Sequence, residues 1–257
     1  MTWEMVIVCF FAGAAAGIGT GFAGMSAAAV VAPILSTFLG IPIYDAIGIG
    51  LISDVLASAI SAYTYKKSNN LDIKKSIVLM ITILVLTIIG SFVATYMPEK
   101  TMNSTMQIAM IIIGLRFIIK PVTTPKENFA IKSKKKILIQ SLLAGLFIGF
   151  ICGFVGAGGG MMMLFVLTTF LGYPLHIAVG TSVFIMTFTA LTGGISHIVL
   201  GGIPDINCLL LCVIFTLLWA LIASKIANKS KPIILNRVVG TILILTSCII
   251  LLINYII

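Results

Sequence analysis

Long apolar stretches alternate with short polar or basic segments along nearly the whole chain. A helix of about 20 apolar residues is long enough to cross the hydrocarbon core of a bilayer. Six stretches are of this kind, namely 44–65, 76–97, 102–119, 177–199, 206–224 and 236–256. Two more, 5–38 and 138–171, are longer and contain glycines near the middle. The pattern predicts an all-α integral membrane protein.

The composition supports this fold class. Apolar residues make up 60% of the chain, charged residues only 9%, and the mean hydropathy is +1.22. The net charge of +9 comes from lysines and arginines between the apolar stretches, which is typical of cytoplasmic loops. We therefore expect the lipid bilayer as a partner, and no nucleic acid. The first residues lack the positive segment of a cleaved signal peptide, so we interpret them as part of the mature chain.

An internal repeat becomes visible when each residue is set beside the one 132 places later. The stretch "GFAGMSAAAVVAPILSTFLGIPIYDAIGIG" (21–50) then aligns without a gap with "GFVGAGGGMMMLFVLTTFLGYPLHIAVGTS" (153–182). The alignment predicts two homologous membrane repeats, 1–120 and 137–257, joined by a basic cytoplasmic linker, 121–136. Each repeat would consist of one long glycine-containing unit and three membrane helices. In transporters, such repeats place the substrate site at their interface, near the bilayer midplane.

Each long unit could either cross the membrane as a long broken helix or fold back as a hairpin. If both fold back, every lysine and arginine except Lys100 lies on one side of the membrane. If both cross, the basic residues are divided between the two sides. The positive-inside rule favours hairpins, which would make the repeats inverted and place both termini outside. A long tilted helix would instead give eight spans and parallel repeats.

The glycines in the long units mark the candidate site. A helix that begins inside the membrane presents free N–H groups and the positive end of its dipole, which together can hold an anion. Glycine lets the backbone turn and approach a ligand closely. The alternative is that these glycines only allow close helix packing. The candidate substrate-binding residues are Gly24, Met25, Ser26, Gly156, Gly158, Gly159 and Gly160.

Polar residues within the predicted spans are further candidates. Thr181 and Ser182 lie at the start of a span next to the second hairpin, where their hydroxyls could contact a ligand or simply bond to their own helix. Asp54 is a carboxylate inside a span and is a candidate for proton coupling. Its alternative role is structural, with a hydrogen bond to a neighbouring serine, Ser53 or Ser58. His197 near a span end is a second proton-coupling candidate or an interfacial residue.

Other chemistry is not expected. The five cysteines lie in apolar sequence without CxxC pairing, so we expect small apolar residues rather than a metal site or a disulfide framework: Cys9, Cys152, Cys208, Cys212 and Cys248. The chain contains no HExxH motif, no nucleophile elbow and no P-loop. We therefore expect no cofactor and no enzymatic activity.

The motifs "GFVGAGGGMMM" and "LGYPLHIAVGTS", with weaker copies in the first half, resemble the TauE/SafE sulfite exporter family. The resemblance covers nearly the whole chain and implies a permease of the bacterial cytoplasmic membrane that moves small anions, particularly sulfite and sulfonates. The first half departs from the pattern, because "GMSAAAV" replaces a glycine cluster. We expect a secondary transporter for a small anion, with proton coupling and a homodimeric state left open. A passive anion channel and a non-transport subunit of a larger complex are the alternatives.

Overall fold

The computed structural model describes residues 2–94, 108, 111–112, 114–121, 139, 142–150, 159–201 and 204–256. Within these ranges the protein is helical and contains no strand. The elements are α1 (Trp3–Ala23), α2 (Ala28–Leu39), α3 (Ile43–Lys67), α4 (Ile73–Ala94), α7 (Gly159–Val166), the π-helix η2 (Leu167–Leu171), α8 (Leu175–Gly201), α9 (Ile206–Lys229) and α10 (Pro232–Ile256). Half of the predicted span 102–119 lies outside the described residues, and 114–119 is helical. The all-helical prediction is confirmed for the part of the chain that is described.

Four of these helices are long and apolar enough to cross a membrane: α1, α3, α8 and α9. The exposed face of α9 indicates that lipid surrounds these helices. At every fourth residue this helix presents a large aliphatic side chain that is 47–58% exposed: Ile206, Leu210, Ile214, Leu218, Ile222 and Ile226. A stripe of this length would be unfavourable in water, whereas lipid tails cover it at no cost.

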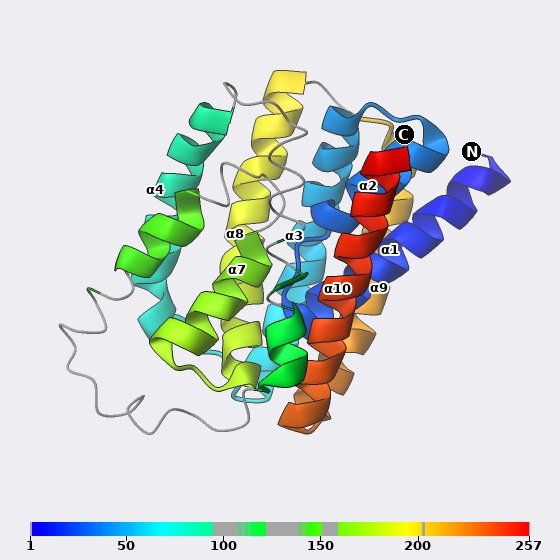
Figure 1. The fold of residues 1–257 in the computed structure, drawn as a ribbon. Coiled ribbons are helices and arrows are strands. Elements are labelled where there is room, and N and C mark those ends of the chain that lie inside the picture. The colour runs from blue at the N-terminus through cyan, green and yellow to red at the C-terminus, as the bar shows by residue number, and fades with distance from the viewer. Residues whose placement is uncertain are drawn as a thin grey trace.

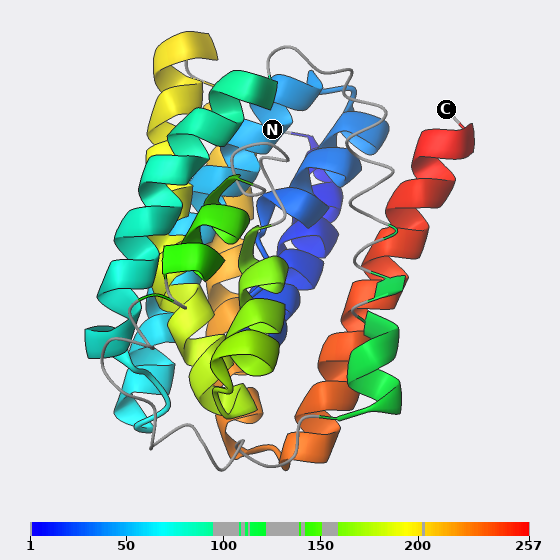
Figure 2. The same ribbon diagram turned by 60° about the vertical axis from the view of Figure 1, so that its left-hand side comes forward.

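The first long apolar unit is broken in the middle. Helix α1 ends at Ala23, Gly24 adopts a left-handed conformation with φ 61°, and α2 begins at Ala28. From the break, α2 runs back toward the end of the bundle at which α1 begins (Figure 1 and Figure 2). The two chain ends also lie at that same end of the bundle (Figure 1).

Glycines allow α1 to pack closely against α9. A Cβ atom on Gly13 would lie 2.6 Å from Phe215 Cβ, and one on Gly17 would lie 2.8 Å from Trp219 Cβ. Both separations are too short for real side-chain contacts, so only glycine fits. Residues 142–150 meet α4 in a similar way. Cβ atoms on Gly145 and Gly149 would each lie 2.7 Å from a Cβ atom of that helix.

Helix α3 forms the centre of the bundle and packs on α2, α8 and α9. Figure 1 and Figure 2 show α3 and α8 side by side. The contact between them places polar residues of both helices in the interior, where Asp54, Thr181 and Ser182 are fully buried. His176 lies in the first turn of α8, where its Nε2 is 3.0 Å from the Ser230 carbonyl oxygen.

Candidate functional site

The two residues that follow α1, Gly24 and Met25, donate their backbone N–H groups to carbonyls in the last turns of α1. The N–H of Gly24 donates to the Thr20 carbonyl at 2.9 Å, and the N–H of Met25 donates to the Gly19 carbonyl at 3.2 Å. The bond from Gly24, with glycine in the left-handed region, is the αL arrangement that ends many helices, and the bond from Met25 reaches one residue further back along α1. The backbone donors of Gly24 and Met25 are therefore engaged within the protein.

Two side chains hold the turn in place. The Thr20 hydroxyl donates to the Met25 carbonyl at 2.8 Å, and the buried Tyr65 hydroxyl donates to the Gly21 carbonyl at 2.9 Å. Both bonds satisfy carbonyl groups that would otherwise lack a partner near the end of α1. The turn is thus fixed from within α1 and from α3.

The start of α2 is different, because it has no side-chain cap. The Asp54 carboxyl group of α3 lies at this point, beside the Ser26 hydroxyl, the Ala27 N–H and the Thr20 hydroxyl. All three groups are potential hydrogen-bond donors to the carboxyl group. Both carboxyl oxygens are buried and have no hydrogen-bond partner in the part of the chain that the structure describes. An acid therefore faces the positive end of a helix without a bond that satisfies it.

The hydrogen bond that the structural alternative expected between the Asp54 carboxyl group and Ser53 or Ser58 is not formed. The Ser53 hydroxyl donates to the Ile49 carbonyl at 2.8 Å, and the Ser58 hydroxyl donates to the backbone carbonyl of Asp54, not to its carboxyl group. Both serines bond within their own helix, which is common for serine in membrane helices. The carboxyl group is left for another partner.

Residues from the second half of the chain meet the first break. A Cβ atom on Gly24 would collide with the Ser182 hydroxyl, and one on Gly160 would collide with the Gly24 carbonyl oxygen. The Ser182 hydroxyl also donates to the Val179 carbonyl of its own helix at 2.8 Å. The start of α7 and the first third of α8 are therefore in direct contact with the break. Of the candidates, Gly24, Met25, Ser26, Asp54, Gly160 and Ser182 gather in one region.

The remaining candidates lie away from the break or outside the described residues. Gly156 and Gly158 lie outside the described residues, and Gly159 is the first residue of α7. The Thr181 hydroxyl accepts from the Asp72 N–H at 3.4 Å and so faces the connection between α3 and α4. His197 lies in α8, about 22 Å along the helix from Ser182. This separation keeps His197 away from the break.

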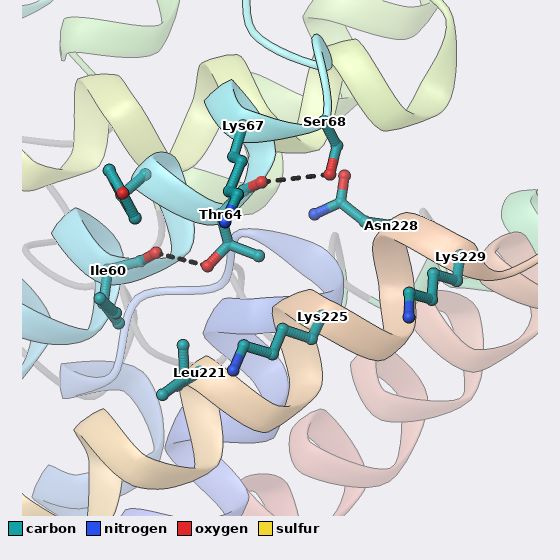
Figure 3. Close-up of a pocket in the computed structure, with 9 residues that line it drawn as sticks. Ile60, Thr64, Lys67, Ser68, Leu221, Lys225, Asn228 and Lys229 are labelled. Atoms are coloured by element: carbon teal, nitrogen blue, oxygen red, sulfur yellow. Dashed lines mark hydrogen bonds between the residues drawn. The ribbon is translucent and has the colours of Figure 1, made fainter.

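A largely apolar pocket with lysines around it lies at the far ends of α3 and α9, outside the set of residues that the sequence indicated. Its volume is about 520 Å³, and Figure 3 shows Lys67 from α3 and Lys225 and Lys229 from α9 around it. No acidic residue is among the described residues that complete the lining, which are Ile60, Tyr63, Thr64, Ser68, Leu221 and Asn228. Three cations without an acid attract anions. The signal in the sequence is the recurrence of lysine at the ends of two apolar stretches.

Three cysteines also come together. We expected separate small apolar residues, but the Sγ atoms of Cys9, Cys208 and Cys212 all lie within 4.8 Å of one another. Cys208 and Cys212 are four residues apart on α9 and so share one face of that helix. Cys9 reaches them from α1. The i, i+4 spacing was visible in the sequence, whereas the approach of Cys9 was not. Cys152 lies outside the described residues.

Together, the apolar helices, the broken helix with an acid at its start and the lipid-facing stripe on α9 define a helical membrane protein with a polar interior site. A family profile described as Sulfite exporter TauE/SafE matches residues 9–250 of the chain. The chain belongs to this family.

Curated relatives carry compatible names. The chain is 21% identical over 223 residues to the probable membrane transporter protein YdhB of Bacillus subtilis, covering 87% of this chain and 91% of that protein. It is 24% identical over 209 residues to the probable membrane transporter protein YunE of the same organism, covering 74% and 75%. It is 28% identical over 204 residues to the probable membrane transporter protein MJ0441 of Methanocaldococcus jannaschii, covering 76% and 71%. No solved structure matches the chain.

The family and the named relatives identify the chain as a membrane transporter. This class agrees with the expected permease and with the absence of enzymatic motifs noted in the sequence.

Proposed function

We propose that the protein is a proton-coupled secondary transporter of a small anion, such as sulfite, a sulfonate or a related sulfur oxyanion. The observation that carries this proposal is the Asp54 carboxyl group, which is buried without a hydrogen bond at the start of α2. The sulfur chemistry of the substrate is taken from the family description. The anionic character rests on the helix start itself.

Proton coupling follows because the ionised Asp54 carboxylate and the transported anion would compete for the same position at the start of α2. An ionised Asp54 puts its own negative charge at the positive end of α2 and repels a second anion. Two unit charges 4 Å apart interact by about 4 kcal/mol at an effective dielectric constant of 20. That energy corresponds to roughly a thousandfold loss of anion affinity. Protonation of Asp54 removes the repulsion, so anion and proton bind together and leave together.

The donors for the anion are those that the C-cap of α1 does not use. They are the N–H of Ala27 and the Ser26 hydroxyl at the start of α2, since the N–H groups of Ala29 and Val30 already donate to the carbonyls of Ser26 and Ala27. Gly24, Gly160 and Ser182 hold the two halves in close contact at this point, and Gly156, Gly158 and Gly159 would supply the matching donors of the second half. Thr181 contributes by holding the neighbouring connection.

Two inverted repeats would give this site alternating access. Equivalent glycines support the repeat, because Gly13 and Gly17 meet α9 while Gly145 and Gly149, 132 residues later, meet α4. The helix C-caps at positions 40 and 172 are likewise both glycines with positive φ, 64° and 78°. Rocking of one repeat against the other would open the break region to each side in turn.

The basic residues give the proposed orientation. With the positive-inside rule, the end of the bundle that carries the lysine pocket faces the cytoplasm of a bacterial cell, and both termini lie outside. Lys67, Lys225 and Lys229 would then concentrate anions at the cytoplasmic mouth of the transporter. In this proposal Asp54 near the break couples transport to protons, and the three lysines at the mouth attract the anion.

The test is uptake into proteoliposomes that contain the purified protein. Sulfite, thiosulfate, methanesulfonate and acetate are supplied separately, with and without an inward proton gradient. The proposal expects saturable uptake of at least one sulfur oxyanion, stimulation by the gradient, and exchange with unlabelled anion inside. Flux that does not saturate and shows no exchange would identify a passive channel. Absence of flux for the whole panel would favour a non-transport subunit.

A further inference from the structure

Three buried thiols of α1 and α9 form a cluster that anion transport does not use. Cys9, Cys208 and Cys212 are each fully buried, and the Sγ atoms of Cys9 and Cys208 are 3.4 Å apart. All three sulfur atoms lie within 4.8 Å of one another. We propose that Cys9, Cys208 and Cys212 bind one monovalent copper ion, Cu(I), in a three-sulfur site.

The dimensions suit a trigonal metal centre. With metal–sulfur bonds of about 2.3 Å, three sulfur atoms around one ion are about 4 Å apart. The observed 3.4 Å contact and the 4.8 Å limit on the other distances bracket this value. Closing the site therefore changes each sulfur–sulfur distance by less than about 1 Å.

The donor set selects the metal. Thiolates are soft ligands that favour Cu(I) and zinc over hard cations such as magnesium or calcium. A structural zinc site needs four ligands, and no fourth histidine, cysteine, aspartate or glutamate joins the cluster within the described ranges. Cu(I) is satisfied by three sulfur atoms in a dry environment. No carboxylate or imidazole needs to be added to complete the site.

The position in the fold explains how the site is maintained. Gly13 and Gly17 bring α1 close to α9 directly beyond Cys9, so the two helices keep their separation with or without an ion. Cys208 lies in the first turn of α9, after the N-cap residue Asp205. The positive end of that helix offsets part of the thiolate charge once the metal is bound. Binding replaces thiol protons by the metal and releases them.

The experiment is a Cu(I) titration of the reduced full-length protein in detergent without oxygen, in competition with a coloured Cu(I) chelator. The expected result is one Cu(I) per chain for the wild type and for the matched control Cys248→Ser, whose cysteine lies on α10. Cys9→Ser, Cys208→Ser and Cys212→Ser should each weaken binding on the order of 100-fold. X-ray absorption of the loaded wild type should report three sulfur neighbours and no nitrogen or oxygen.

Each outcome decides the proposal even if a variant folds poorly, because the absorption spectrum uses the wild type alone. Failure of the reduced wild type to take Cu(I) from the chelator would overturn it, as would binding that survives loss of any of the three cysteines. A Cys9–Cys208 disulfide in protein purified without reductant, combined with no Cu(I) uptake after reduction, would assign the cluster to redox chemistry instead. None of these readouts depends on anion transport.

Discussion

Comparing Gly24→Ala with Gly40→Ala distinguishes the specific role of the break from the general cost of placing alanine in a left-handed conformation. Gly24 and Gly40 have nearly the same φ, 61° and 64°, and each ends a helix. An alanine in this conformation costs about 1–2 kcal/mol at either position. At Gly40 the added methyl meets nothing within 4 Å, whereas at Gly24 it collides with the Ser182 hydroxyl. Overpacking of this kind adds about 1–3 kcal/mol.

The expected free energy of unfolding is therefore lowered by about 1–2 kcal/mol in Gly40→Ala and by about 2–5 kcal/mol in Gly24→Ala. Thermal unfolding in detergent and anion uptake in proteoliposomes measure the two consequences. Gly24→Ala should lose most uptake, while Gly40→Ala should keep it. The double variant Gly24→Ala/Ser182→Ala should regain most of the overpacking part of the lost stability. Equal stability and equal uptake of the two single variants would refute the assignment of Gly24 to the site.

Two further substitutions test the surroundings of the break and the lysine pocket. Tyr65→Phe removes the 2.9 Å bond to the Gly21 carbonyl and should lower the free energy of unfolding by about 1–3 kcal/mol, whereas Tyr63→Phe, at a side chain that is 62% exposed, should leave it unchanged. Thermal unfolding of the two variants decides this. Lys225→Gln should raise the anion KM by roughly a few-fold at low salt, with the difference shrinking as ionic strength rises, while Lys74→Gln outside the pocket should not. An effect on kcat alone would contradict attraction by the pocket.

The apolar pattern predicted most of the helical architecture because membrane helices need only length and apolarity. The spans at 44–65 and 206–224 correspond to α3 and α9 with ends shifted by a few residues. The interruption near Gly24 was also predicted, because glycine weakens a helix and can adopt a left-handed turn, but Gly13 and Gly17 of the same unit lie within the unbroken helix α1. Exact helix ends depend on caps, such as the left-handed turn at Gly24, and these follow from contacts rather than from periodicity.

The site was only partly predictable from sequence, because its members come from different helices. Asp54 could be recognised as an acid inside a span, but its place at the start of α2 depends on how α3 packs. The engagement of the Gly24 and Met25 N–H groups follows from the path of the chain after α1. The approach of Cys9 to Cys208 likewise requires the α1–α9 contact. Contacts between helices that are far apart in the sequence produce no periodic pattern in that sequence.

The most direct test of the account is the number of protons that accompany each anion in wild type and Asp54→Asn. Proteoliposomes with a lumenal pH dye receive an inward gradient of thiosulfate or a sulfonate, whose charge does not titrate near neutral pH. Asp45→Asn, on the first turn of the same helix, is the matched control. Wild type and Asp45→Asn should acidify the lumen as the anion enters, faster at lower external pH. Asp54→Asn should pass the anion without acidification, and acidification at the wild-type ratio in this variant would contradict the account.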